Sequence, residues 1–315
     1  MCALSNVFVI GELCEDIVLF NAASIEVLGY KVWAEDIVSL TGGSAAYVAE
    51  VLTHLGAEVH LSSVVGDDAP GAMILKSLEG LGINCNYISK IPSMRTTRSI
   101  IICNDGGKDF VGCSPILPMD LPDISFFTNS SMVYLAGYML YPELWSDKTY
   151  ELLKELKQRN VFIALDCQLL PNPDIDPIKM GRLDRLFPLT NVFFVARKEV
   201  KQLFGDIPPE DAGKLLLDMG CETIALKQGN NGCVVMTAEE THHERGYCTQ
   251  VYNPIGSGDI FGAAFSFCRI NGNSLKDSTR FANVFTALSL KRYENKRIYP
   301  DKEDVGSITS KIDPI

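Results

Sequence analysis

Short apolar runs alternate with helical patterns along most of the chain. The apolar runs predict strands at residues 7–10, 59–65, 132–136, 161–165, 192–195 and 223–226. Helices are predicted at residues 45–55, 71–81 and 147–159, and two more close the chain at 259–269 and 275–292. Gly56, Gly82 and Asn160 follow the first three helices, as helix-stopping residues do. Repeated strand–helix units with apolar strands predict a mostly parallel sheet with helices on both faces.

Further β patterns fall outside this alternation. They lie at residues 17–20, 32–39, 97–103 and 109–112, and no clear helix separates the first two. The sequence Asn104-Asp105-Gly106-Gly107 between the last two is a hairpin-turn signal. We therefore expect one domain of residues 1–315 with a small β lid formed by about residues 12–40 and 87–112. A late β pair is expected at residues 233–236 and 248–252.

Several residues mark one rim of the predicted sheet. Gly11, Asp166, Ala196 and Gly229 all lie just past the ends of predicted strands. Ligands of parallel sheets bind beyond the carboxyl ends of the strands. A lid over that rim would exclude water from a bound ligand.

Composition narrows the classes of partner. The chain has 315 residues, is 47% hydrophobic and carries a formal net charge of −11. No Lys/Arg run supplies the basic surface that a nucleic-acid reader needs, so we expect a small-molecule partner and no nucleic acid. No segment reaches the roughly 18 uncharged apolar residues that a membrane span requires.

The cysteines and the first residues bear on the compartment. The ten cysteines are scattered and form no CxxC pair. We expect free thiols in a reducing cytosol, where disulfides are rare. Residues 1–20 contain no Lys or Arg, and three acidic residues interrupt the apolar stretch, so no secretory leader is expected. These features predict a cytoplasmic protein.

The richest candidate functional segment precedes the helix at residues 259–269. Residues 253–259 read Asn-Pro-Ile-Gly-Ser-Gly-Asp. Gly256 and Gly258 let the backbone approach a ligand closely, and the helix N-terminus adds N–H groups and partial positive charge. Together they predict an anion hole suited to phosphate, with Asp259 placed to act as a base for an attacking hydroxyl. For this segment alone, a structural helix cap made of Gly and Asp is the alternative.

Three motifs resemble the signatures of the ribokinase (PfkB-type) carbohydrate kinase family. Residues 41–47 (TGGSAAY), followed by 55–57 (LGA) and 64–71 (VVGDDAPG), resemble its N-terminal signature. Residues 226–232 (LKQGNNG) resemble its nucleotide-side turn, and 256–262 (GSGDIFG) its C-terminal signature. The motifs occur in family order over nearly the whole chain, without a P-loop or a GxGxxG dinucleotide motif. The resemblance implies a ribokinase-like, doubly wound α/β fold with a β lid.

The resemblance also implies roles on the substrate side. Asp259 matches the family's base for the substrate hydroxyl. Asp16, after the first strand, matches an acidic residue that holds substrate hydroxyls. The family's anion hole is matched by Gly256, Ser257 and Gly258. Its substrate-side glycine pair is matched by Gly42 and Gly43.

On the nucleotide side the resemblance implies ATP and Mg²⁺. Lys227, Gly229 and Gly232 match the ATP-side loop, and Asn283 resembles a residue beside the adenine. Glu199 matches the Glu of an Asn-x-x-Glu motif tied to magnesium and phosphate.

Three positions depart from the family pattern. Tyr47 stands where the family usually has an Asn that helps to hold the sugar, so the substrate pocket should be reshaped. Ala196 replaces the Asn of the Asn-x-x-Glu motif. Asn253 replaces an Asp that supports a monovalent-cation site in some members, which argues against activation by potassium.

Two polar segments have weaker assignments. Arg95 and Arg98 lie on the predicted lid, where a surface role competes with contact to an anionic substrate, and Arg98 is kept as a substrate-side candidate. His242 and His243 lie among glutamates, in a stretch typical of a solvated loop.

The sequence therefore predicts an ATP-dependent kinase that phosphorylates a hydroxyl of a sugar or sugar-like compound. A nucleoside kinase is an alternative, because Tyr47 offers a ring for stacking on a base. A catalytically silent sensor of a sugar or nucleotide is another, favoured by the altered motif positions and opposed by Asp259. In the family the lid often pairs with the lid of a second subunit, and open sheet edges attract strand pairing, so a homodimer through the lid is expected.

Overall fold

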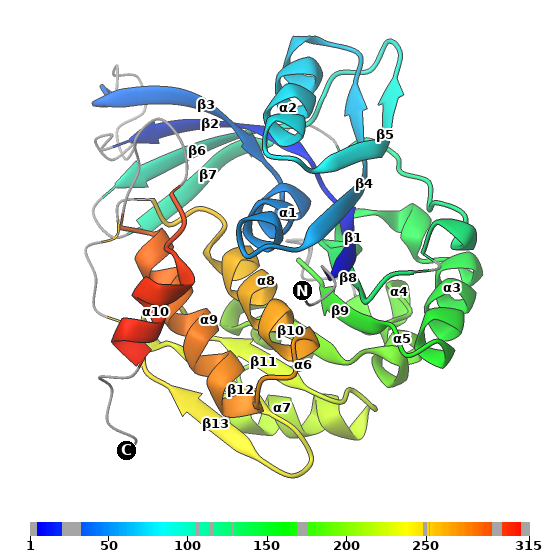
Figure 1. The fold of residues 1–315 in the computed structure, drawn as a ribbon, viewed down its shortest axis with the longest axis vertical. Helices are drawn as coiled ribbons and strands as arrows, with labels where there is room; N and C mark the ends of the chain where they lie inside the picture. Colours follow the sequence, from blue (N-terminus) through cyan, green and yellow to red (C-terminus); the bar gives the residue numbers. More distant parts are fainter. Residues whose placement is uncertain are drawn as a thin grey trace.

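A nine-stranded sheet forms the centre of the molecule (Figure 1). The computed structural model describes residues 5–20, 33–104, 107–113, 116–127, 129–168, 176–247, 251, 253–291 and 298–309. The strand order is β13 (Thr241–Glu244), β12 (Cys233–Met236), β11 (Ile224–Lys227), β10 (Val192–Ala196), β9 (Phe162–Asp166), β8 (Met132–Ala136), β1 (Asn6–Gly11), β4 (Glu58–Gly66) and β5 (Asn84–Ile91). The strands from β11 to β5 are parallel, and β12 and β13 are antiparallel additions at one edge.

Helices cover both faces of this sheet, as the strand–helix alternation predicts. They are α1 (Ser44–His54), α2 (Ala69–Gly80), α3 (Asp147–Gln158), α4 (Pro177–Met180), α5 (Leu183–Leu186), α6 (Arg197–Phe204), α7 (Pro209–Asp218), α8 (Ser257–Ile270), α9 (Leu275–Ser289) and α10 (Lys302–Thr309). Within the described ranges, short 3₁₀ turns lie at Ile124–Phe127, Tyr138–Leu140, Pro142–Leu144, Phe187–Leu189 and Gly229–Asn231.

The buried core divides into two layers because neighbouring strand residues point to opposite faces. On β1, Val7 and Val9 pack in the layer beneath α1, α8 and α9. Phe8 and Ile10 pack in the other layer, which lies beneath α3 and α7. Both layers are apolar, which explains why the parallel strands read as continuous hydrophobic runs.

A separate four-stranded sheet forms the lid, seen at the upper left of Figure 1. Its order is β3 (Asp36–Gly42), β2 (Cys14–Phe20), β6 (Arg98–Asn104) and β7 (Gly107–Cys113). The expected lid boundary near residue 87 is wrong, because residues up to Ile91 belong to β5 and pair with β4 in the large sheet. Residues 21–32 of the expected lid lie outside the described ranges.

The late β pair also differs from expectation. β12 pairs with β13, at Thr241–Glu244, which the sequence presented as a polar loop containing His242 and His243. Residues 248–250 and 252 of the expected partner lie outside the described ranges. In the described part of the chain, no three His, Cys, Asp or Glu side chains are grouped so that they could hold a metal ion.

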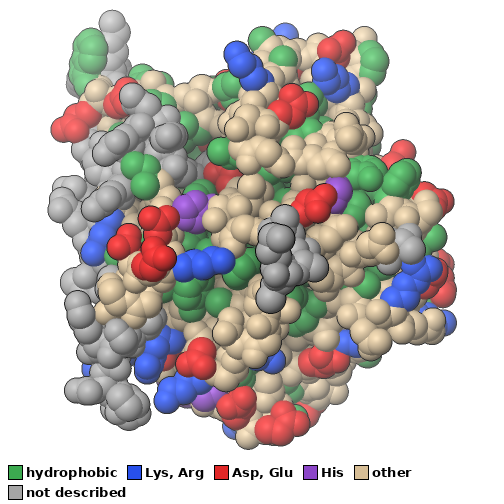
Figure 2. Space-filling model, in the orientation of Figure 1, with side chains coloured by type: hydrophobic (Ala, Val, Ile, Leu, Met, Phe, Trp, Pro, Cys, Tyr) green, Lys and Arg blue, Asp and Glu red, His purple; other side chains and the backbone are tan. Residues whose placement is uncertain are grey.

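Charges are mixed on the surface. On the face drawn in Figure 2, Lys and Arg side chains are interspersed with Asp and Glu and form no basic stripe. Among the described helices, none combines the length and apolar character needed to cross a bilayer.

Candidate active site

The carboxyl ends of the parallel strands meet at one rim, as expected. Gly11 is paired with Ala136, and Ala136 is paired with Asp166. Ala196 at the end of β10 is paired with Lys227 at the end of β11. Side chains from distant parts of the sequence are therefore brought to the same edge of the sheet.

The N-terminus of α8 points its first turn at this rim. Gly256 precedes the helix in a left-handed conformation, with φ of +73°. Asn253 shapes the approach, because its Oδ1 accepts the Ile255 N–H at 3.0 Å. The first N–H groups of a helix have no partner within the helix, so this turn has the geometry that an anion hole requires. We call residues 256–258 the candidate anion hole.

Asp259 lies in that first turn and is 9% exposed. Burial and the nearby Asp166 carboxylate raise the pKa of Asp259 to about 7, against the opposing effects of Lys227, Lys108 and a hydrogen bond with Ser44. A carboxyl group with a pKa near neutrality can exchange a proton with a substrate hydroxyl. Gln168 Nε2 in turn donates to Ser44 Oγ, so Ser44 links the end of β9 to Asp259.

Lys227 supplies a largely buried positive charge beside the candidate anion hole; its side chain is 15% exposed. Its Nζ lies 2.6 Å from Asp166 Oδ2, and the Asp166 side chain is 2% exposed. A methyl group built on Gly258 would lie 3.1 Å from the same Nζ, which shows how close Lys227 is to the anion hole. Burial disfavours the ammonium form, but Asp166, Glu199 and Asp259 together raise the pKa of Lys227 above its usual value. Lys227 therefore stays charged.

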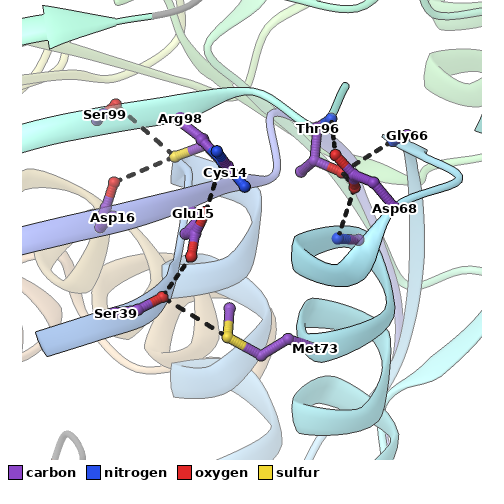
Figure 3. Close-up of polar contacts among 11 residues, drawn as sticks. Cys14, Glu15, Asp16, Ser39, Gly66, Asp68, Met73, Thr96, Arg98 and Ser99 are labelled. Carbon is purple, nitrogen blue, oxygen red and sulfur yellow. Dashed lines mark hydrogen bonds and ion pairs between the residues drawn. The ribbon is translucent and has the colours of Figure 1, made fainter. Parts of the chain in front are cut away.

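The lid side of the site is built around Asp16 on β2. Asp16 is 3% exposed and accepts hydrogen bonds from the Cys14 thiol at 3.2 Å and the Tyr47 hydroxyl at 3.0 Å. Burial and the Asp16 charge raise the pKa of Cys14, so its thiol stays protonated and donates. Figure 3 shows Cys14 between Asp16 and Ser99 of the neighbouring strand β6. Gly42 is needed here, because a Cβ at that position would lie 2.2 Å from Asp16 Cγ.

Two charged residues at the site were not expected from the sequence. Lys108 reaches in from β7 and donates to the Pro254 carbonyl at 3.1 Å, just before the anion hole. Burial lowers the pKa of Lys108, although Asp259 and Asp16 act in the opposite direction. Glu12 follows β1, and burial with the charges of Asp16 and Asp259 raises its pKa to about 7. Lys108 lies in a polar hairpin of the lid, where nothing in the local sequence distinguishes it from a surface lysine.

The expected ATP-side residues gather at the turn between β11 and β12. The Gln228 N–H donates to the Gly232 carbonyl at 2.9 Å and closes the turn that contains Gly229. Asn283 of α9 donates to the Arg245 carbonyl at 2.6 Å, in the segment after β13. That segment approaches the turn closely, since a Cβ on Gly232 would lie 2.0 Å from the Glu244 carbonyl oxygen.

Glu199 lies in the first turn of α6. Its carboxylate accepts the Ala196 N–H at 2.5 Å, so it caps the helix whose Asn-x-x-Glu motif lacks the Asn. A cleft of about 540 Å³ opens between α6 and Lys227. The cleft is lined by more basic than acidic side chains of this segment, which makes it suitable for an anionic group. The basic ones are Arg197, Lys198 and Lys201, and the acidic one is Asp206.

Arg98 is placed away from Asp16. It is paired with Glu15 across β2 and β6, and its Nε lies 2.7 Å from Glu15 Oε2. Successive residues of β2 point to opposite faces, so Glu15 and Arg98 occupy the lid face opposite to Asp16 (Figure 3). We therefore leave Arg98 out of the substrate site.

A comparison with protein families identifies the chain. Residues 4–301 match the model of the pfkB family of carbohydrate kinases. The chain belongs to this family. As a PfkB kinase it transfers phosphoryl groups from ATP to sugar-like substrates, and the nine-stranded sheet with its lid is the ribokinase fold.

Individual relatives of the kinase are distant. The chain is 24% identical to the aminoimidazole riboside kinase of Salmonella typhimurium over 86% of this chain and 83% of that protein. It is 22% identical to the ribokinase of Bacillus subtilis over 98% of this chain and the whole of that protein. The structure of Arabidopsis thaliana ribokinase complexed with ribose and ATP superimposes with a TM-score of 0.77 at 20% identity, covering 99% of this chain and 100% of that one.

Proposed function

We propose that Asp259 is the catalytic base of this PfkB kinase and that residues 256–258 bind the phosphoryl group during its transfer. Asp259 takes the proton of the acceptor hydroxyl while the oxygen of that hydroxyl forms a bond to the γ-phosphorus of ATP. The bond from that phosphorus to the β–γ bridging oxygen breaks, and ADP leaves. The observation that carries this assignment is the buried Asp259 carboxyl, with its pKa raised to about 7, in the turn that forms the anion hole.

Lys227 and Lys108 are the proposed cations of the transfer step. Lys227 lies beside Gly258 and remains charged because Asp166 neutralises part of its burial cost. Lys108 approaches from the lid and is held on the Pro254 carbonyl, one residue before Ile255 and two before Gly256. Preorganised cations at the oxygens that gain charge stabilise the transition state without a reorganisation cost.

Magnesium fits the nucleotide side of this site. Mg²⁺ in kinases is held by one or two carboxylates together with substrate phosphates and water, so it does not need a cluster of protein ligands. Glu199 and Asp166 are both close enough to Lys227 to raise its pKa. We propose these two carboxylates as the groups that hold Mg²⁺, which would neutralise phosphate charge when bound.

Asp16 and the Gly42–Gly43 pair are the proposed acceptor side. Asp16 and Asp259 both lie close enough to Glu12 for their charges to add to the effect of burial in raising its pKa. Tyr47 is only 2% exposed and offers no free ring face for a base. The structure therefore gives no support to the nucleoside-kinase alternative through stacking on Tyr47, and we propose a sugar or polyol as acceptor.

An ATP-turnover assay against a panel of sugars, polyols and nucleosides tests this function. We expect turnover with at least one sugar or polyol and its loss in Asp259→Asn. A wild-type protein that binds ATP but phosphorylates none of the panel would favour the silent-sensor alternative.

We propose a homodimer through the lid. Ile37 and Ile100 on the face opposite to Asp16 are 63% and 40% exposed, and Trp33 beside the lid is 80% exposed. Exposed apolar residues on a sheet with open edges favour association. Light scattering should give twice the mass of the chain, and Ile37→Lys should reduce it to the monomer mass; a monomeric wild type would contradict the proposal.

We also propose a reducing, cytoplasmic setting. In the described structure, seven cysteines form no disulfide: Cys14, Cys85, Cys103, Cys167, Cys221, Cys233 and Cys268. Thiol titration of protein unfolded without reductant tests this proposal and should find every cysteine reactive.

A further inference from the structure

Tyr47 connects the two halves of the site. It lies in the first turn of α1, which Gly43 precedes with φ of +91°. Its hydroxyl donates to Asp16 Oδ2 at 3.0 Å. Its ring lies against the anion hole, because a Cβ on Gly256 would fall 2.2 Å from Tyr47 Cδ1 and 2.4 Å from Cε1. One side chain thus extends from the proposed acceptor carboxylate to the proposed phosphoryl site.

Protein groups already surround the Asp16 carboxylate. Cys14 donates to Oδ1 and Tyr47 to Oδ2, while the Gly42 backbone lies directly against the carboxylate. Asp16 is 3% exposed in this arrangement. Of these neighbours, Cys14 and Gly42 belong to the lid strands β2 and β3, and only the Tyr47 hydroxyl is at the end of a rotatable side chain from outside the lid.

The Tyr47 ring is held by an apolar cluster. Tyr47 belongs to one buried cluster with four lid residues and with Ile255, which precedes the candidate anion hole. The lid residues are Val18, Phe20, Ile101 and Cys103. The cluster joins the inner face of the lid to the main body. Displacing the Tyr47 ring would therefore disturb the packing between the lid and the main body.

We propose that Tyr47 is an internal competitor for the acceptor subsite, with its phenol hydroxyl occupying the place on Asp16 that a sugar hydroxyl takes. This inference rests on the proposed role of Asp16 in binding the acceptor. A phenol and a sugar hydroxyl are the same kind of donor to a carboxylate, so they exclude one another where the remaining directions are blocked. An acceptor binds only by displacing the phenol and with it the lid contacts of the ring, and the kinase selects for acceptors whose other contacts offset that cost.

Tyr47→Phe isolates the competition, because it keeps the ring in the apolar cluster and removes only the hydroxyl. The probe is ribose, the sugar in the solved complex of the Arabidopsis ribokinase. Titration calorimetry without ATP should show weak ribose binding by the wild type. A hydrogen bond to a charged group corresponds to about a tenfold to hundredfold change in affinity, so Tyr47→Phe should bind ribose about tenfold more tightly or better. In turnover, KM for sugars should fall with little change in kcat.

Tyr138→Phe is the matched control. Tyr138 is also a buried phenol, but its hydroxyl donates to the Leu144 and Gly181 carbonyls and does not contact Asp16. Its removal should lower stability and leave ribose affinity unchanged. A second variant, Tyr47→Asn, restores the amide that the family has at this position and should also strengthen ribose binding.

The calorimetric result is independent of whether the protein turns over ATP, so it can fail while the kinase assignment stands. Unchanged ribose affinity in Tyr47→Phe, or absence of binding in both proteins, overturns the competition. Weaker binding in Tyr47→Phe overturns it as well and shows instead that the phenol orients Asp16 for the sugar. Tighter binding in Tyr47→Phe with the control unchanged supports the proposal.

Discussion

The Lys227 ammonium lies 2.6 Å from the Asp166 carboxylate, at the rim where β11 and β9 end on either side of β10. The two charges act on Asp259 in opposite directions: Asp166 raises its pKa and Lys227 lowers it. The ion pair thus sets how readily the proposed base loses its proton, in addition to placing a cation beside Gly258.

Lys227→Met should move the pH dependence of the reaction. The variant removes a charge that lowers the pKa of Asp259, so the rise of kcat/KM with pH should shift to higher pH. Lys227→Arg keeps the charge and should keep the profile near that of the wild type. The pH profile of kcat/KM reports ionisations of the free enzyme, which makes it the appropriate measurement.

Asp166→Asn provides the opposite change. It removes the carboxylate that raises the pKa of Asp259, so the same limb should move to lower pH. It also removes one of the two proposed Mg²⁺ ligands, so kcat should fall, and the position of the limb is read from the remaining activity at saturating Mg²⁺. If both Lys227→Met and Asp166→Asn leave the limb where it is, the ion pair does not tune the base.

Asp259→Asn should abolish most turnover. A general base contributes about 10²–10⁴ in rate, and the amide cannot accept the proton. The wild-type kcat/KM should rise with pH through about 7, where Asp259 loses its proton, and the variant should lack that rise. ATP affinity, measured by calorimetry, should change little. Asp67→Asn, at an exposed carboxylate near β4, is the control and should behave as the wild type.

Asp259→Asn should also increase the free energy of unfolding. The pKa of Asp259 is raised from 3.8 to about 7 in the folded protein, so the ionised carboxyl is disfavoured there. The cost grows as the pH rises from about 4 to about 7 and then levels, reaching at most about 4 kcal/mol at about 1.4 kcal/mol per pKa unit. Urea unfolding at pH 5 and pH 8 should show a larger gain for Asp259→Asn at pH 8. An equal gain in the free energy of unfolding at both pH values would mean that the folded protein does not raise the pKa of Asp259.

The parts of the fold that followed from sequence are those buried on both faces. β1, β8 and β9 read as apolar runs because helices cover both of their faces. β5 escaped assignment to the large sheet because it is an edge strand with no fully buried position. β13 was mistaken for a loop for the same reason, since half of its residues are exposed and all are polar. Edge strands lack the pattern that burial imposes.

The candidate site divides in a similar way. Gly256, Gly258 and Asp259 lie within four consecutive residues, so a motif in the sequence is enough to predict that they act together. Lys108 joins them only through the packing of a lid hairpin nearly 150 residues earlier, bonded to Pro254. The direction of Tyr47 also depends on contacts with the lid, so its identity was informative in the sequence and its orientation was not.

Asp68 ties the base of the lid to the main body and supplies the last prediction. Its Oδ1 accepts the Gly71 N–H at 3.0 Å and the Thr96 hydroxyl at 2.5 Å, and its Oδ2 accepts the Thr96 N–H at 3.0 Å (Figure 3). Thr96 is fully buried in the connection from β5 to β6 and in turn accepts the Gly66 N–H at 3.0 Å. One carboxylate thus caps α2 and holds the segment from which the lid strand β6 starts.

Asp68→Asn should lower the free energy of unfolding by about 1–2 kcal/mol, the typical cost of losing a helix cap or a hydrogen bond to a charged group. An amide has only one oxygen, so its NH₂ group would face the N–H of either Gly71 or Thr96.

The hydrogen bonds from Thr96 and Gly71 outweigh burial and lower the pKa of Asp68 below 3.8. Its contribution is therefore complete at pH 7 and is lost as the pH falls through that lowered value. Urea unfolding at pH 7 should show the deficit for Asp68→Asn and none for Asp67→Asn, and the deficit should shrink below about pH 4. A deficit of the same size in Asp67→Asn would assign the effect to general surface charge and not to the bonds with Thr96 and Gly71.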